Sequence, residues 1–158
     1  LKGPDGLYNF ILQPGRVPER YVPLPDKGGN FRIEAENVQN PDLEADYIVA
    51  HFAILYPEPL VDADVYVYGK FAGWELVPGL KMTYDDKNKA YVGEAELKQG
   101  YYDYMYAVVP RSGKKVNLVE MQNNFYQTPN EYNIRFYFYD NNLMCFRFVG
   151  YYNLTAQL

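Results

Sequence analysis

Alternation of apolar and polar side chains runs through most of this chain and constrains its fold more than any other feature. The clearest example is residues 131–139, where Tyr132, Ile134, Phe136 and Phe138 share one side of an extended segment. Successive side chains of a β-strand point to opposite faces, so this pattern predicts a half-buried strand. No window of about 12 residues keeps the period of 3.6 that is typical of a helix.

Similar segments follow one another along the chain, separated by turn residues. The expected strands are residues 31–35, 46–56, 64–68, 80–84, 90–97, 101–109, 131–139 and 143–152. Many short strands between turns are typical of a β-sandwich. We therefore expect an all-β, immunoglobulin-like antiparallel β-sandwich over residues 46–158. A loop-rich N-terminal extension with short edge strands, residues 1–45, precedes it, and the whole chain is expected to form one compact unit.

Aromatic residues are the unusual part of the composition, with 18 Tyr and 9 Phe. They fit pleated, half-buried surfaces, and Tyr also suits interfaces because it buries a large area while keeping a polar group. The alternation divides the tyrosines into two sets. The set that shares faces with apolar residues is expected in the core: Tyr102, Tyr104, Tyr106 and Tyr132. The set on the opposite faces is expected to contact a partner: Tyr66, Tyr68, Tyr101, Tyr137 and Tyr139.

Charge and reactive residues exclude several classes of function. The net charge of −5 argues against a general nucleic-acid binder, which would carry a basic surface. The single cysteine, Cys145, excludes an internal disulfide and lies in an apolar run, so we expect it to be buried and inert. The single histidine, His51, alternates opposite the apolar face of its strand and is expected at the surface or between sheets.

No catalytic, cofactor or metal site is predicted. The sequence contains no Gly-x-Ser-x-Gly motif, no Gly-x-Gly-x-x-Gly motif and no recognisable catalytic triad. Acidic residues cluster at residues 42–46, 62–64 and 85–86, which fall at strand edges or turns where they favour solubility. We therefore expect the protein not to be an enzyme.

The central region resembles a family of sugar-binding sandwiches. Residues 65–74 read Val-Tyr-Val-Tyr-Gly-Lys-Phe-Ala-Gly-Trp, and residues 100–104 read Gly-Tyr-Tyr-Asp-Tyr. This region is similar to the early-set immunoglobulin-like modules that bind glycogen and starch. The resemblance implies the early-set type of sandwich, and an α-glucan-like polysaccharide stacked on Trp74. The lysine that the family uses falls at Met105, so carbohydrate binding is the alternative function.

A second resemblance covers nearly the whole chain. Its motifs are Gly-Pro-Asp-Gly-Leu-Tyr-Asn-Phe at residues 3–10, Glu-Ala-Asp-Tyr at 44–47, His-Phe at 51–52, Lys-Gln-Gly-Tyr-Tyr-Asp-Tyr at 98–104, Asn-Phe-Tyr-Gln-Thr-Pro-Asn-Glu-Tyr at 124–132 and Phe-Val-Gly-Tyr at 148–151. These motifs resemble the C-terminal part of the type IX secretion system plug protein of Bacteroidota, first catalogued as a domain of unknown function (DUF5103).

This second resemblance implies a function. It implies a non-enzymatic, cofactor-free interaction domain on the periplasmic side of the outer membrane. Such a protein binds the large translocon barrel and blocks its periplasmic opening when no substrate is engaged. The chain opens Leu-Lys-Gly-Pro-Asp, which reads as a mature or excised fragment rather than as an export signal. We expect Trp74 and the second set of tyrosines to provide the partner-contact or ligand surface.

Overall fold

The computed structural model describes residues 2–3, 6–23, 28–113, 115–125, 127–128 and 130–156. Pro4, Asp5, Tyr126 and Pro129, which belong to the motifs quoted above, lie outside the described residues. Contacts divide the chain into two compact units, described separately below. The larger comprises Leu1–Glu19 and Leu24–Asn124, and the smaller comprises Arg20–Pro23 and Phe125–Leu158. We expected one sandwich from residue 46 to residue 158, whereas the contacts divide this range after Asn124.

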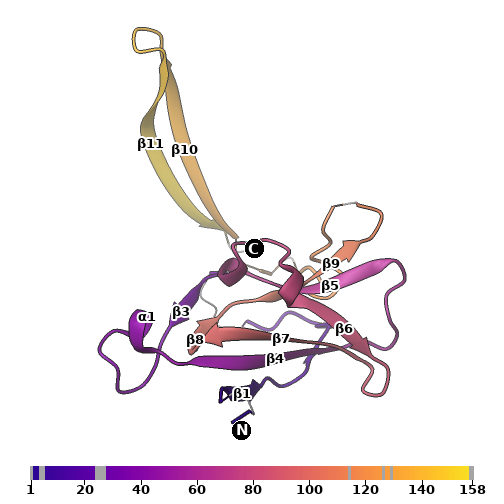
Figure 1. The fold of residues 1–158 in the computed structure, drawn as a ribbon. Helices are drawn as coiled ribbons and strands as arrows, with labels where there is room; N and C mark the ends of the chain where they lie inside the picture. Colours follow the sequence, from indigo (N-terminus) through magenta and orange to yellow (C-terminus); the bar gives the residue numbers. More distant parts are fainter. Residues whose placement is uncertain are drawn as a thin grey trace. The chain divides into compact units, whose positions relative to one another are not determined.

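The larger unit is an all-β sandwich built on a seven-stranded sheet (Figure 1). The sheet has the order β1-β4-β7-β6-β5-β9, and β2 also pairs with β4. In chain order its strands are β1 (Tyr8–Ile11), β2 (Gly15–Arg16), β4 (Tyr47–Leu55), β5 (Ala63–Tyr68), β6 (Lys81–Asp85), β7 (Ala90–Lys98) and β9 (Met105–Pro110). The predicted all-β sandwich is confirmed. The two N-terminal strands, β1 and β2, run parallel to β4.

The remaining elements of this unit are short. Strand β3 (Phe31–Ile33) pairs with β8 (Gly100–Tyr102), and the helical elements are α1 (Pro41–Glu44), η1 (Lys70–Ala72) and η2 (Pro78–Leu80). The expected strand over residues 101–109 is interrupted, because its first part pairs with β3 and its second part with β5. No helix in the described part of the chain has both the length and the apolar character needed to cross a membrane.

The sheet folds over at β6 and so produces the two layers. Lys81 and Met82 pair with β5, whereas Thr83–Asp85 pair with β7. The layer that contains β4 and β7 therefore faces the layer that contains β5 and β9. A hydrogen bond crosses between them, in which the Tyr106 hydroxyl donates to the Ala53 carbonyl at 3.1 Å.

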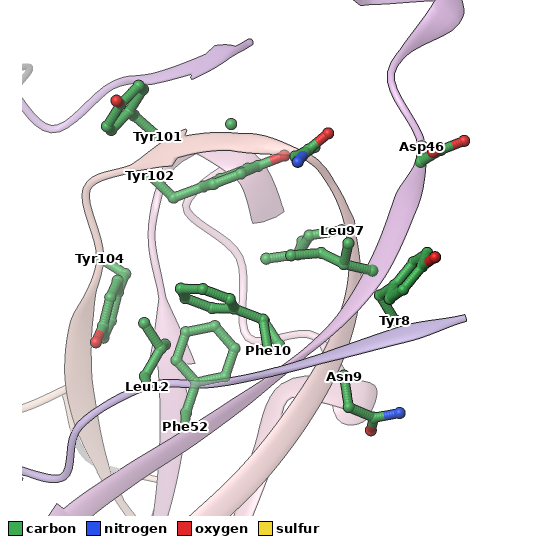
Figure 2. A pocket seen from close by; sticks show the side chains of 14 residues that line it. Tyr8, Asn9, Phe10, Leu12, Asp46, Phe52, Leu97, Tyr101, Tyr102 and Tyr104 are labelled. Carbon is green, nitrogen blue, oxygen red and sulfur yellow. The ribbon is translucent and has the colours of Figure 1, made fainter. Parts of the chain in front are cut away.

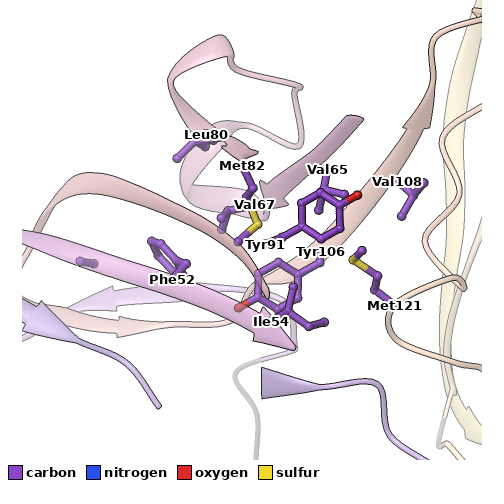
Figure 3. Close-up of a cluster of buried hydrophobic side chains, with 11 residues drawn as sticks. Phe52, Ile54, Val65, Val67, Leu80, Met82, Tyr91, Tyr106, Val108 and Met121 are labelled. Atoms are coloured by element: carbon purple, nitrogen blue, oxygen red, sulfur yellow. The ribbon is translucent and has the colours of Figure 1, made fainter. Parts of the chain in front are cut away.

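The core between these layers follows the predicted alternation. Phe52 and Ile54 of β4 are buried, as are Val65 and Val67 of β5 (Figure 3). Tyr106 is buried with them, as expected, and burial raises the pKa of its hydroxyl. The other two tyrosines of this unit that were expected in the core, at positions 102 and 104, are only partly buried.

The smaller unit contains the predicted C-terminal hairpin. Strand β10 (Asn130–Asp140) pairs antiparallel with β11 (Cys145–Ala156), with a β-bulge opposite the step from Phe136 to Tyr137. Two expectations are wrong here: Tyr132 is 51% exposed rather than in the core, and Cys145 is exposed rather than buried. The physical reason is that the hairpin has only two strands, and the described residues of this unit form no second layer that covers either face.

Candidate functional site

A pocket of about 700 Å³ opens on the inner face of β1, β4 and β7. The strand register builds it, because paired residues on neighbouring strands share a face. Tyr8 lies beside Ile48, which lies beside Leu97, and Phe10 lies beside Ala50 in the next row. The small side chain of Ala50 leaves space between the larger side chains of Ile48 and Phe52 on the same face of β4, and this space forms the floor of the pocket.

Aromatic rings form the walls of this pocket and fix one another in place. Phe52 meets Tyr104 edge to face at 5.0 Å between ring centroids, and Tyr102 stacks on Phe31 at 5.5 Å. The Tyr102 hydroxyl also donates to the Lys98 carbonyl at 2.6 Å. Burial raises the pKa of the Tyr102 hydroxyl. A tyrosine hydroxyl is already neutral at physiological pH, so Tyr102 acts there as a neutral hydrogen-bond donor.

The mouth of the pocket is apolar and almost without charge. Tyr8, Phe10 and Tyr101 are each more than half exposed there. Among the residues that line the pocket, all within the described part of the chain, Asp46 is the only charged one. Figure 2 shows Asp46 and Asn9 directed away from the cluster of rings. The pocket therefore offers aromatic surface and no ionic partner.

His51 lies on the opposite, outer face of the same strands, where its side chain is 35% exposed; of the two expected positions, at the surface or between sheets, it takes the surface. Its Nε2 is 2.6 Å from the Asn9 amide oxygen, and its Nδ1 is 3.6 Å from a Glu94 carboxylate oxygen. A histidine acts as a catalytic base when it is placed against a nucleophile that it can deprotonate. An amide and a carboxylate are not such nucleophiles, so these contacts hold the imidazole ring on the sheet surface.

Trp74 and Tyr68, two predicted contact residues, lie together. Their ring centroids are 5.4 Å apart, and the Tyr68 hydroxyl donates to the Trp74 carbonyl at 2.8 Å. Trp74 is 41% exposed. A Cβ added at Gly29 would lie only 3.2 Å from the indole ring, so part of the ring packs against this backbone. Tyr66, two residues before Tyr68 on the same face of β5, is half-buried.

The other predicted contact residues belong elsewhere. Tyr101 is on β8 and lines the pocket mouth, whereas Tyr137 and Tyr139 are on β10 of the smaller unit. The five predicted tyrosines therefore belong to three different sheets, and Trp74 lies in the turn that follows η1. Sequence reasoning also missed Tyr8 and Phe10 as pocket residues, because their role depends on parallel pairing with a strand far along the chain.

The hairpin has two different faces, set by its register. One face, called here the apolar hairpin face, carries exposed apolar side chains along most of its length: Tyr132, Ile134, Phe136, Phe138, Tyr152 and Leu154. The opposite face is polar at the end of the hairpin away from the turn. There the Tyr151 hydroxyl donates to the Asn133 amide oxygen, and the Asn153 amide donates to the Glu131 carboxylate.

Toward the turn, the second face becomes aromatic as well. Tyr137 packs on Phe148 with ring centroids 5.7 Å apart, and Tyr139 packs on Phe146 at 5.1 Å. All four side chains are exposed. The hairpin thus presents aromatic side chains on both faces near its turn, whereas away from the turn the second face is mostly polar and carries Tyr151 as its aromatic side chain.

Within the ranges that the structure describes, no three His, Cys, Asp or Glu side chains gather where they could hold a metal ion.

Comparison with known proteins yields a fold relative and no functional name. No protein-family model matches the chain, and no curated protein matches it. Among solved structures, the chain is similar to a hypothetical protein from Parabacteroides merdae ATCC 43184, with 31% identity and a TM-score of 0.80. The match covers 96% of this chain and 38% of that chain. The chain thus spans well under half the length of this relative, and it shares with the relative an all-β sandwich fold.

Proposed function

We propose that this chain is a non-enzymatic interaction domain that docks onto a protein partner through the apolar hairpin face. The single observation that carries the proposal is the exposure of all six side chains on that face, between 42% and 58%. Two-stranded hairpins are at best marginally stable in water and gain stability from further strands or a covering layer. A partner that covers this face supplies that layer.

The size of the face supports a specific contact rather than chance exposure. Its four aromatic side chains, each about half exposed, present on the order of 400 Å² of apolar surface. Patches of roughly 300–600 Å² are the largest on a typical monomer and are often functional. Near the turn, Asp140 and Arg147 pair with each other at 3.2 Å, so these charges are already matched when the face is covered.

The partner we propose is the outer-membrane translocon of a type IX secretion system, bound from the periplasmic side. The support for this partner is the resemblance of the motifs quoted above to the plug protein family. In this proposal the hairpin lies against the barrel protein, and the sandwich is the scaffold that carries it. The contact is structural, so it needs neither a cofactor nor a metal.

A pull-down with matched variants tests the proposal. Tagged chain is added to detergent extracts of a secreting Bacteroidota strain, and the translocon barrel is identified in the eluate by mass spectrometry. We expect the wild type to recover the barrel. The Ile134→Ser/Phe136→Ser variant should recover at least tenfold less of the barrel protein. The matched control, Asn133→Ser/Arg135→Ser, changes the opposite, polar face of the same strand and should retain binding.

Two results would count against the proposal. One is failure of the wild type to recover the barrel under conditions that preserve other complexes of the translocon. The other is equal recovery by the Ile134→Ser/Phe136→Ser variant and the control, provided that circular dichroism shows both to be folded. The second result would move the docking surface away from the hairpin.

Carbohydrate binding remains the alternative, and the exposure of Trp74 beside Tyr68 is the observation that favours it. An exposed indole is a suitable stacking platform for a sugar ring, but part of this one packs on Gly29. Affinity electrophoresis in glycogen gels separates the two functions. Retardation that disappears in Trp74→Ala would support the sugar-binding alternative, and unretarded migration of the wild type would exclude it.

A further inference from the structure

We propose that the pocket between β1, β4, β7 and β8 is a binding site for a small, uncharged molecule with an aromatic or alkyl body. This inference goes beyond docking through the hairpin. It concerns the larger unit alone, and it depends on none of the residues of the apolar hairpin face.

The dimensions of the pocket fit a small molecule. Its volume of about 700 Å³ lies within the range of roughly 300–1,000 Å³ that is usual for ligand and cofactor sites. Such sites are lined mainly by apolar and aromatic side chains with few polar groups. Here Phe10, Leu12, Phe52, Leu97 and Tyr104 line the space, and Figure 2 shows them pointing toward one another.

The charge of the lining selects an uncharged ligand. No lysine, arginine or histidine is among the lining residues, all of which the structure describes, so an anionic group would lose its hydration without gaining an ion pair. Asp46 is the one acidic lining residue, and it is directed away from the rings. A cationic ligand therefore gains no carboxylate partner inside the pocket.

The walls of the pocket are held before any ligand arrives. Phe52 and Tyr104 pack edge to face, Tyr102 stacks on Phe31, and the Tyr102 hydroxyl is anchored on the Lys98 carbonyl. A site that is already ordered loses little conformational entropy when it binds. The aromatic walls therefore favour binding of a planar or alkyl group without rearrangement.

The strands at the mouth favour a compact molecule over an extended peptide. Peptides often bind by adding a strand to a free sheet edge. The outer edge of β1 is already bridged at Tyr8 by Lys2, and the Gly3 amide donates to the Leu7 carbonyl at 2.7 Å. On the other side of the mouth, β8 is paired with β3 through Tyr101 and its neighbours. An added strand would have to displace these partners.

Titration with an uncharged aromatic probe, N-phenyl-1-naphthylamine, tests the inference on the full chain. Methyl-labelled protein is followed by NMR during the titration. We expect saturable shifts in the methyl signals of Leu12, Ile48 and Leu97, which line the pocket. The methyl signals of Ile134 and Leu154, on the apolar hairpin face, serve as internal controls and should not report the same binding event.

Matched variants then locate the site. Phe10→Ser and Tyr8→Ser each remove a half-exposed ring from the mouth and should weaken probe binding at least tenfold. Ile11→Ser changes the next residue of the same strand, which is 75% exposed and does not line the pocket, and should bind like the wild type. Using two mouth variants guards against a folding defect in either one.

The outcomes are separable from those of the docking proposal. Absence of saturable shifts at the three pocket methyls in the wild type overturns the inference, as does equal weakening by Phe10→Ser and Ile11→Ser. The Ile134→Ser/Phe136→Ser variant should bind the probe in the pocket as the wild type does. The docking proposal can therefore fail while the pocket is confirmed, and the reverse is equally measurable.

Discussion

At the residue scale, Gly100 shows how one small side chain positions a wall of the pocket. A Cβ at this position would lie 2.3 Å from the Arg32 carbonyl oxygen and 3.0 Å from the Ile33 Cα. Both are backbone atoms, so β3 would have to move away from β8. Only glycine allows the two strands to approach this closely, and their pairing places Tyr101 and Tyr102 at the pocket.

Gly100→Ala should therefore destabilise the larger unit by about 1–3 kcal/mol, the usual range for overpacking. Urea denaturation followed by tyrosine fluorescence measures the change. Gly79→Ala is the matched control, because nothing lies within 4 Å of a Cβ at that position. Equal effects of the two substitutions would show that the close approach of β8 to β3 does not limit stability.

Asp64 belongs to an acidic segment that the sequence analysis assigned to solubility, and it has a more specific role. Its carboxylate lies 2.8 Å from Lys81 Nζ and 2.9 Å from Arg111 Nη2. Hydrogen bonds from these two side chains hold the pKa of Asp64 below its ordinary value of 3.8. The folded state thus favours the carboxylate, and this contribution to stability is present above the ordinary pKa and lost as the pH falls through the folded-state pKa.

The free energy of unfolding of Asp64→Asn should consequently fall less than that of the wild type when the pH is lowered from about 6 to about 3. The urea midpoint at each pH measures this difference. A pH dependence identical to that of the wild type would mean that the paired carboxylate makes no net contribution to folding.

At the element scale, alternation predicted the strands well because it depends on local sequence. The strand expected at residues 46–56 is β4, Tyr47–Leu55, and its expected inward residues Phe52 and Ile54 are buried. The expected C-terminal hairpin is β10 and β11. Periodicity tells which residues share a face, but not whether another layer covers that face. This is why Tyr132 was wrongly expected in the core.

The pocket could not be predicted from the sequence for a related reason. Its rows depend on the parallel register of Tyr8 with Ile48 and of Phe10 with Ala50, and such long-range pairing leaves no local signal. The neighbouring placement of Trp74 and Tyr68 could have been predicted, since both belong to one short motif. The distribution of the five predicted contact tyrosines over three sheets could not.

The hairpin should be the more dynamic element in the free protein. Among the side chains of its strands that the structure describes, residues 131–140 and 145–155, none is buried in the core. Two strands alone also have marginal stability. Amides of β10 and β11 should exchange with deuterium faster than those of β4 and β7, which lie in the centre of the sandwich sheet. Hydrogen exchange of the full chain alone measures this, and protection of the hairpin equal to that of β4 would contradict it.

At the scale of the whole molecule, the buried core lies entirely within the larger unit, from Ala45 to Met121 among the described residues. A chain ending at Asn124 should therefore unfold cooperatively, with a free energy within about 1 kcal/mol of the same transition in the full chain. Ile54→Ala removes most of a core side chain that is 1% exposed, and it should lower the free energy of unfolding by about 2–5 kcal/mol. This variant shows that the assay detects a loss of core packing. Loss of cooperative unfolding on truncation would mean that the smaller unit is required for folding of the larger one.

The chain thus has two parts with different roles. The sandwich supplies a stable core and an apolar pocket, and the hairpin supplies exposed apolar surface. We propose that the partner binds to this apolar hairpin face. Hydrogen exchange of the full chain in complex with the purified translocon barrel tests this proposal. We expect the amides of β10 and β11 to become protected in the complex while those of β4 stay unchanged. Protection confined to the larger unit, with the hairpin exchanging as fast as in the free chain, would contradict it.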